Sequence, residues 1–161
     1  LAHSDIALLS PFQESWALMF RVANRRSTLL SDVEAKLMLV LSDGEVGKER
    51  LSYFNLPLQM SGISYLPLTW TVVHPLNAES PMAGMSHKEL ELRRAEMILT
   101  IKGFDEVYMQ PVITRMSYRW DEIVWGGRFT KAFSSKNGIM QLELERISEH
   151  TTEEAPEHLP S

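Results

Sequence analysis

Residues 66–81 read Leu66-Pro-Leu-Thr-Trp-Thr-Val-Val-His-Pro-Leu-Asn-Ala-Glu-Ser-Pro81. Threonines and valines alternate around Trp70, a pattern that predicts a β-strand with a large aromatic side chain on one face. His74-Pro75 ends this strand, because proline lacks the N–H group that a β-ladder needs and forces the residue before it into an extended conformation. The stretch therefore predicts a strand in the middle of the chain.

A polar corner and a short helix are expected next. Asn77–Pro81 is rich in turn-forming residues. Ser86 is followed three residues later by Glu89, which is the spacing of a capping box, and predicts a helix that runs to about Arg94.

Most of the remaining sequence is typical of strands. In residues 32–41, Val33 and every second residue to Leu41 are apolar, and the opposite face carries Asp32, Glu34, Lys36 and Met38. The composition also suits a helix, but alternation over ten residues favours a half-buried strand. Further strands are expected near residues 14–22, 50–58, 96–102, 107–118, 122–125, 128–133 and 139–144, with a loop at 59–65, a turn at 103–106 and a hairpin turn at Asn137-Gly138. About eight strands predict an all-β fold, a β-sandwich with one or two short helices.

Three segments are expected along the chain. Residues 1–13 look like an irregular lead-in, residues 14–148 form the folded domain, and residues 149–161 form an acidic tail with two prolines that we expect to be disordered. The chain has 161 residues, which suits one domain. It begins with Leu1 rather than methionine, so we expect sequence upstream of position 1.

Charge and composition narrow the class of protein. The formal net charge is −5, which argues against a nucleic-acid binder because that role normally needs a basic face. The sequence has no cysteine, which excludes disulfides and thiol chemistry and favours an intracellular location. No apolar run approaches the roughly 20 residues that cross a bilayer, and no signal peptide is visible.

No catalytic motif is convincing. Gly44-Glu-Val-Gly47-Lys48 lacks the spacing of a phosphate-binding loop, and the five histidines are too scattered for a metal site. His74 is interpreted as a structural histidine whose ring binds the turn that follows it. Asp105-Glu106 is read as part of a solvated turn. Taken alone, the residues predict a non-enzymatic intracellular sandwich without metal or cofactor, whose function stays open.

Four blocks of the sequence nevertheless resemble one known family. They are Leu68-Thr-Trp-Thr-Val-Val-His-Pro-Leu-Asn-Ala-Glu-Ser-Pro81, Tyr118-Arg-Trp-Asp-Glu-Ile-Val-Trp-Gly-Gly-Arg-Phe129, Leu18-Met-Phe-Arg-Val-Ala-Asn-Arg-Arg26 and Gln141-Leu-Glu-Leu-Glu-Arg-Ile147. In order and spacing they are similar to the C-terminal domain of inward-rectifier potassium channels, most of all the prokaryotic members. The family's membrane helices and selectivity filter do not occur in this sequence.

The resemblance implies a role in ion transport at the cytoplasmic face of the cell membrane. In the family this domain is an immunoglobulin-like β-sandwich. Four copies of it form a homotetrameric ring around a water-filled vestibule, through which potassium ions pass, and the ring takes part in gating. The alternatives are a free-standing intracellular β-sandwich that binds another molecule and, more remotely, a sandwich enzyme.

The resemblance also implies site residues. Glu106, and less strongly Asp43, would line the vestibule as rings of four carboxylates. The G-loop, which narrows the vestibule, would consist of Val107, Tyr108, Met109 and Gln110. Arg26 and Lys36 match basic positions that contact anionic membrane lipid or a neighbouring subunit. For Lys36 the alternative is a cross-strand salt bridge within one chain.

Overall fold

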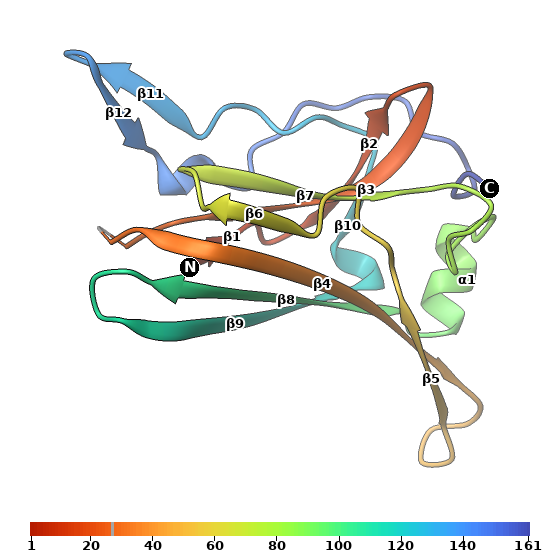
Figure 1. Ribbon diagram of the computed structural model, residues 1–161. Helices are drawn as coiled ribbons and strands as arrows, with labels where there is room; N and C mark the ends of the chain where they lie inside the picture. Colours follow the sequence, from red (N-terminus) through yellow and green to blue (C-terminus); the bar gives the residue numbers. More distant parts are fainter. Residues whose placement is uncertain (27) are drawn as a thin grey trace.

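Two five-stranded sheets stack against each other in the computed structural model, which describes residues 1–26 and 28–161 (Figure 1). The first sheet contains β1 (Ala2–His3), β3 (Ser15–Ala23), β2 (Ala7–Phe12), β10 (Ile123–Trp125) and β7 (Thr69–Pro75). The second contains β5 (Arg50–Asn55), β4 (Leu30–Asp43), β8 (Glu96–Asp105), β9 (Gln110–Arg119) and β6 (Gly62–Tyr65). The remaining elements are the hairpin of β11 (Phe133–Lys136) and β12 (Ile139–Leu142), helix α1 (His87–Leu92) and the 3-10 turns η1 (Trp120–Glu122) and η2 (Leu144–Arg146). The predicted all-β sandwich is confirmed.

Strand β4 is the centre of the second sheet. It pairs antiparallel with β5, β6 and β8. The alternate residues from Val33 to Leu41 are buried, whereas Glu34, Lys36 and Met38 are exposed on the other face. The strand interpretation of this segment is therefore correct, because the period of two places the apolar side chains of Val33, Ala35, Leu37, Leu39 and Leu41 between the sheets.

The mid-chain strand and helix also form as predicted. Strand β7 pairs with β3 and buries Trp70. The hydroxyl of Ser86 accepts the N–H of Glu89 at 3.2 Å and so caps α1. The helix ends at Leu92 rather than at Arg94, since Arg94 has a φ of 47° and leaves helical geometry.

The lead-in expected at residues 1–13 is wrong, because most of it is strand. Ala7, Leu8 and Leu9 are fully buried in β2, which lies between β3 on one side and β10 on the other. The pairing with β10 is parallel and the pairing with β3 is antiparallel. The Pro11 that suggested irregular structure lies near the end of β2, where its missing N–H disturbs little of the ladder.

The expected disorder of residues 149–161 is also wrong. The N–H of Thr151 donates to the carbonyl of Arg128 at 2.8 Å, and Leu159 exchanges backbone hydrogen bonds of 2.8 and 2.7 Å with Met85 and Gly84. The side chain of Leu159 is buried, and the C-terminus of the chain lies close to α1 in Figure 1. One apolar residue and a series of backbone hydrogen bonds order a segment whose acidic composition suggested disorder.

Two smaller predictions need correction. The loop expected at 59–65 contains the short strand β6, which pairs with the edge of β4. The turn expected at 103–106 begins later, because β8 continues to Asp105. Gly103 lies within the ladder, where a Cβ atom would come 3.3 Å from a methyl group of Val33. Its small size thus serves close packing against β4 instead of a turn.

The hairpin turn at Asn137-Gly138 is confirmed, with φ values of 52° and 76°. Two positive φ angles are what a two-residue type I′ turn requires.

Arg21, on β3, holds the chain on either side of this hairpin. Its guanidinium donates to the carbonyls of Thr130, Arg146 and Ile147, the last at 2.8 Å.

Candidate functional site

The predicted G-loop residues lie at one end of the sandwich, in the turn between β8 and β9 (Figure 1). Val107, Tyr108 and Met109 form the tip and are between 64% and 69% exposed. Gln110 is the first residue of β9 and is also exposed. Glu106 is exposed beside them, and its backbone N–H donates to the carbonyl of Leu29 at 3.1 Å. The tip of this turn therefore exposes three large, mainly apolar side chains to solvent.

The side chain of Asp105 holds this turn in place through hydrogen bonds. One carboxylate oxygen accepts the N–H groups of Val107 and Tyr108 at 2.9 and 3.0 Å. The other accepts from Arg26 Nη1 at 2.6 Å and from the Thr28 hydroxyl at 2.9 Å. The side chain of Asp105 has no exposed surface. A single buried carboxylate therefore joins the turn to the segment that precedes β4.

These donors favour the ionised form of Asp105. The hydrogen bond from the backbone N–H of Tyr108 is the largest influence and lowers the pKa of Asp105 below its usual value. Burial opposes it, and the bonds from Thr28, Val107 and Arg26 lower the pKa further. Sequence reasoning missed this role, because it read Asp105 as solvated with Glu106. The available signal was an aspartate directly before a turn, where its side chain can bind the backbone N–H two residues ahead.

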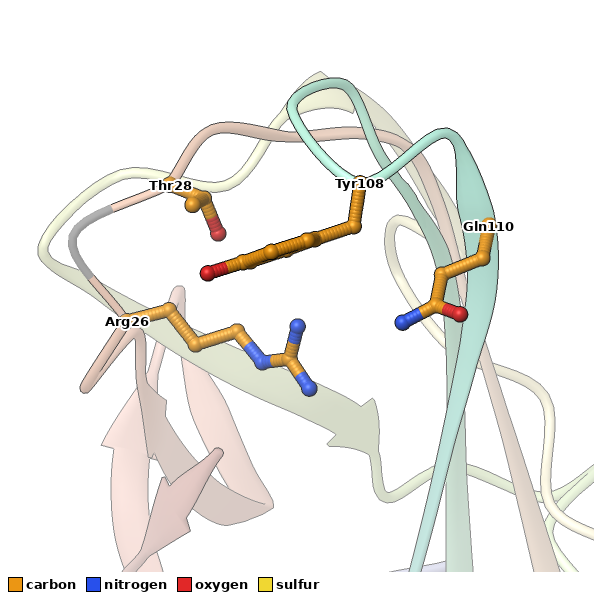
Figure 2. Close-up of a pocket in the computed structure, with 4 residues that line it drawn as sticks. All are labelled: Arg26, Thr28, Tyr108 and Gln110. Atoms are coloured by element: carbon orange, nitrogen blue, oxygen red, sulfur yellow. The ribbon is translucent and has the colours of Figure 1, made fainter.

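A hollow of about 320 Å³ opens beside the turn. Figure 2 shows that Arg26, Thr28, Tyr108 and Gln110 surround it. The phenol ring of Tyr108 extends across the hollow toward Thr28 and Arg26, and the Gln110 amide faces it from β9 (Figure 2). Guanidinium, amide and hydroxyl groups together offer donors that suit an oxygen-rich anion.

Asp43 does not lie near the turn between β8 and β9. Asp43 is the last residue of β4, whereas the first residue, Leu30, pairs with Asp105 at the turn. A strand of this length separates the two ends by roughly 40 Å at ~3.3 Å per residue. The Asp43 carboxylate also binds Arg93 through two hydrogen bonds of 3.0 and 3.1 Å. This bond from Arg93 lowers the pKa of Asp43, and the arginine compensates its charge.

Lys36 lies on the outward face of β4, directly opposite Thr100 of β8. Within residues 1–26 and 28–161, its ammonium group makes no ion pair. The cross-strand salt bridge considered for Lys36 is therefore not formed.

His74 has the structural role that the sequence suggested. Its ring is almost fully buried, with Nδ1 2.6 Å from the carbonyl oxygen of Pro57 and Nε2 2.8 Å from the hydroxyl of Ser80. A neutral ring satisfies both contacts when Nδ1–H donates to Pro57 and Nε2 accepts from Ser80. Burial lowers the pKa of His74, so the ring stays neutral.

The described residues hold no cluster of three side chains suited to a metal ion. Among the helices they form, none has the length and apolar character needed to span a bilayer.

Comparison with known proteins identifies the class. Residues 1–159 match the family model of the inward rectifier potassium channel C-terminal domain. The chain is 32% identical over 150 residues to the inward rectifier potassium channel Kirbac3.1 of Paramagnetospirillum magnetotacticum, covering 91% of this chain and 50% of that protein. It is 27% identical over 162 residues to the human G protein-activated inward rectifier potassium channel 1, covering 97% of this chain and 32% of that channel. Mouse G protein-activated inward rectifier potassium channel 3 is 27% identical over 166 residues, with 97% and 40% covered.

The fold is a β-sandwich, and the family model and the relatives that match this chain are those of inward rectifier potassium channels. The chain belongs to the inward rectifier potassium channel C-terminal domain family. It spans about half the length of the bacterial relative and about a third of the human one.

Proposed function

We propose that this chain is the cytoplasmic vestibule and gating domain of a potassium channel, at the inner face of the cell membrane. Four copies surround the ion path as a homotetrameric ring, and potassium ions pass along its axis. The observation that carries this proposal is the family match over residues 1–159. In this role the domain shapes an electrostatic environment and transmits movement, and it performs no catalysis.

The turn between β8 and β9 supports the proposal because its tip is both exposed and anchored. Val107, Tyr108 and Met109 project from the sandwich, while buried Asp105 fixes their backbone. Four such tips around one axis form an apolar constriction of the ion path. Glu106 then contributes one carboxylate per subunit beside the constriction.

The Glu106 carboxylate influences passing ions because fourfold symmetry repeats it around the ion path. A single exposed charge is screened over about 8 Å at physiological salt. Four carboxylates around a narrow aqueous passage attract cations together and repel anions. Asp43 contributes to a different level of the path, at the far end of β4, and more weakly because Arg93 neutralises it.

Arg26 and Lys36 are proposed to contact anionic lipid or a neighbouring subunit. Arg26 lines the hollow beside the turn with its guanidinium, and one of its N–H groups is already bound to Asp105. A lipid phosphate there would bind next to the residue that anchors the constriction. Lipid binding at Arg26 would therefore change the conformation of the turn through the ion pair between Arg26 and Asp105.

The test of the vestibule is Glu106→Gln in the full-length channel. We expect lower cation conductance, or weaker block by intracellular multivalent cations, measured in excised membrane patches. Glu14→Gln is the matched control, since Glu14 is exposed between β2 and β3, away from the proposed axis. Unchanged conductance and block in Glu106→Gln would remove Glu106 from the ion path.

A free-standing binding module would not bring several copies of the loop tip together at an axis. Cross-linking between the tips therefore distinguishes that alternative from the channel ring. The chain has no cysteine, so Met109→Cys introduces one thiol per domain at the tip. In full-length channels with other cysteines replaced, oxidation should link subunits in pairs on non-reducing gels. Val46→Cys, at the exposed turn between β4 and β5, is the control and should stay unlinked. Equal linking of both variants would argue against tips that meet at an axis.

A further inference from the structure

Met109 is the most exposed methionine of this chain. The sequence contains nine methionines and no cysteine, so methionine supplies all of its sulfur. Met82 and Met97 lie in the core and have no exposed surface. Met109 is 69% exposed, followed by Met60 at 51% and Met140 at 48%. An oxidant in solution therefore meets the thioether at the tip between β8 and β9 while the core sulfurs stay shielded.

The backbone keeps the Met109 side chain outside the sandwich. Met109 has a φ of 52°, a left-handed conformation that glycine and asparagine adopt more readily than methionine does. The two residues before it are fixed by Asp105, which accepts the N–H groups of Val107 and Tyr108. A change of polarity at the Met109 sulfur therefore stays at the exposed tip.

The chemistry available to this sulfur is oxidation by hydrogen peroxide. A sulfur lone pair attacks one peroxide oxygen, and the S–O bond forms as the O–O bond breaks. The departing hydroxide takes the proton left on the transferred oxygen and becomes water. Sulfur is oxidised by two electrons and the peroxide is reduced by two. The product is methionine sulfoxide, which is polar and is returned to methionine by two sulfoxide reductases, one for each epimer.

The position of Met109 gives this modification a consequence for ions. The inference rests on the function proposed above, in which four tips form an apolar constriction of the ion path. Apolar constrictions block ions by losing their water. A sulfoxide oxygen accepts hydrogen bonds, so four of them would hydrate the constriction and offer oxygen ligands to potassium ions. Val107 and Tyr108 have no sulfur, so Met109 is the tip residue that changes in this way.

We propose that Met109 is a reversible oxidation site, and that its conversion to the sulfoxide by peroxide makes the constriction more permeable to cations. The oxidised tip conducts more readily than the reduced tip. Reduction of the sulfoxide restores the apolar constriction.

The first experiment tests the site in the 161-residue chain. The chain is treated with hydrogen peroxide and digested, and mass spectrometry follows the gain of one oxygen atom at each methionine. We expect rapid modification of Met109 and none of Met82 and Met97 while circular dichroism shows the domain to be folded. A Met109 peptide that gains oxygen no faster than the Met97 peptide overturns the proposal.

The second experiment measures the effect in full-length channels with other cysteines replaced, in excised inside-out patches. Peroxide at the cytoplasmic face should raise the current, and the two sulfoxide reductases together should return it to its starting value. Met109→Leu keeps a similar apolar volume without a sulfur, so its current should not respond. Met60→Leu is the matched control, because Met60 is exposed in the loop between β5 and β6, and it should respond as the unmodified channel does.

Met109→Gln tests the same idea without an oxidant. Its amide places a permanent oxygen at the tip, so its current before peroxide should exceed that of Met109→Leu. Equal currents in these two variants, or an equal peroxide response in Met109→Leu and the unmodified channel, overturn the proposal.

The cross-linking of Met109→Cys separates a failure of this inference from a failure of the proposed function. If Met109 is oxidised without a change in current and the tips cross-link, the ring stands and this inference alone is overturned. If the current is unchanged and the tips do not cross-link, the constriction is overturned together with it.

Discussion

Arg26 and Asp105 are 79 residues apart in sequence and 2.6 Å apart in the structure, measured from Nη1 to Oδ2. The guanidinium is partly exposed, with 37% of the arginine side chain accessible, and the carboxylate is not accessible at all. Because the same carboxylate holds the N–H groups of the turn, this ion pair couples the segment before β4 to the tip between β8 and β9.

Asp105→Asn should loosen the turn. Asparagine keeps the size of the side chain and can still accept the N–H groups of Val107 and Tyr108. Its amide NH₂ faces the donor groups of Arg26 and Thr28, so the ion pair is lost. We expect a lower melting temperature and faster amide hydrogen exchange at Val107 and Tyr108. Asp121→Asn, which removes only an exposed ion pair with Arg119, should change neither quantity appreciably.

Asp105 should also make the stability of the domain sensitive to acid. Its pKa is lowered in the folded state, so its contribution is complete above the unfolded value of about 3.9. That contribution is lost as pH falls through the lower, folded pKa, because the folded state then takes up the proton. Urea unfolding measured from pH 6 to pH 2 should show a smaller acid-dependent loss in Asp105→Asn. Parallel curves for the two proteins would contradict this role.

His74 should have its effect at a higher pH. Burial lowers its pKa from 6.5, so the unfolded chain takes up a proton before the folded one. Stability is therefore complete above about pH 6.5 and falls as pH decreases toward the folded pKa. His74→Ala should cost about 1–3 kcal/mol at pH 7, because Ser80 loses its buried partner. His74→Asn keeps a donor for Pro57 and should remove this part of the pH dependence in urea unfolding.

The sequence was most informative where one face of an element is buried. Residues 32–41 alternate so regularly that only a strand buries their apolar side chains, and β4 confirms it. It was least informative where a residue serves a distant partner. Gly103 signals a turn in isolation, but its lack of a side chain makes room for Val33 on a neighbouring strand.

The candidate site likewise contains residues that the sequence could place and residues that it could not. Glu106 and the exposed tip could be placed in one loop by their adjacency in sequence. Asp105 and Glu106 are both acidic and adjacent, so local pattern could not tell the buried residue from the exposed one. The difference depends on Arg26 and Thr28, which no local pattern connects to the turn.

Tyr118 should make the domain sensitive to alkali. Its hydroxyl donates to the carbonyl of Ser4 at 2.8 Å, which links β9 of the second sheet to the segment after β1 of the first. Burial raises the pKa of Tyr118 to about 12, whereas an unfolded tyrosine ionises near 10.

Between about pH 10 and pH 12 the unfolded chain releases this proton first, so the free energy of unfolding should fall with rising pH. Tyr118→Phe should lose about 1 kcal/mol at pH 7, the value of one buried hydrogen bond, and should show a shallower alkaline slope in urea unfolding. Tyr53→Phe is the control, because Tyr53 is exposed on β5. If Tyr118→Phe kept the full alkaline slope, ionisation of Tyr118 would not be what destabilises the sandwich at high pH.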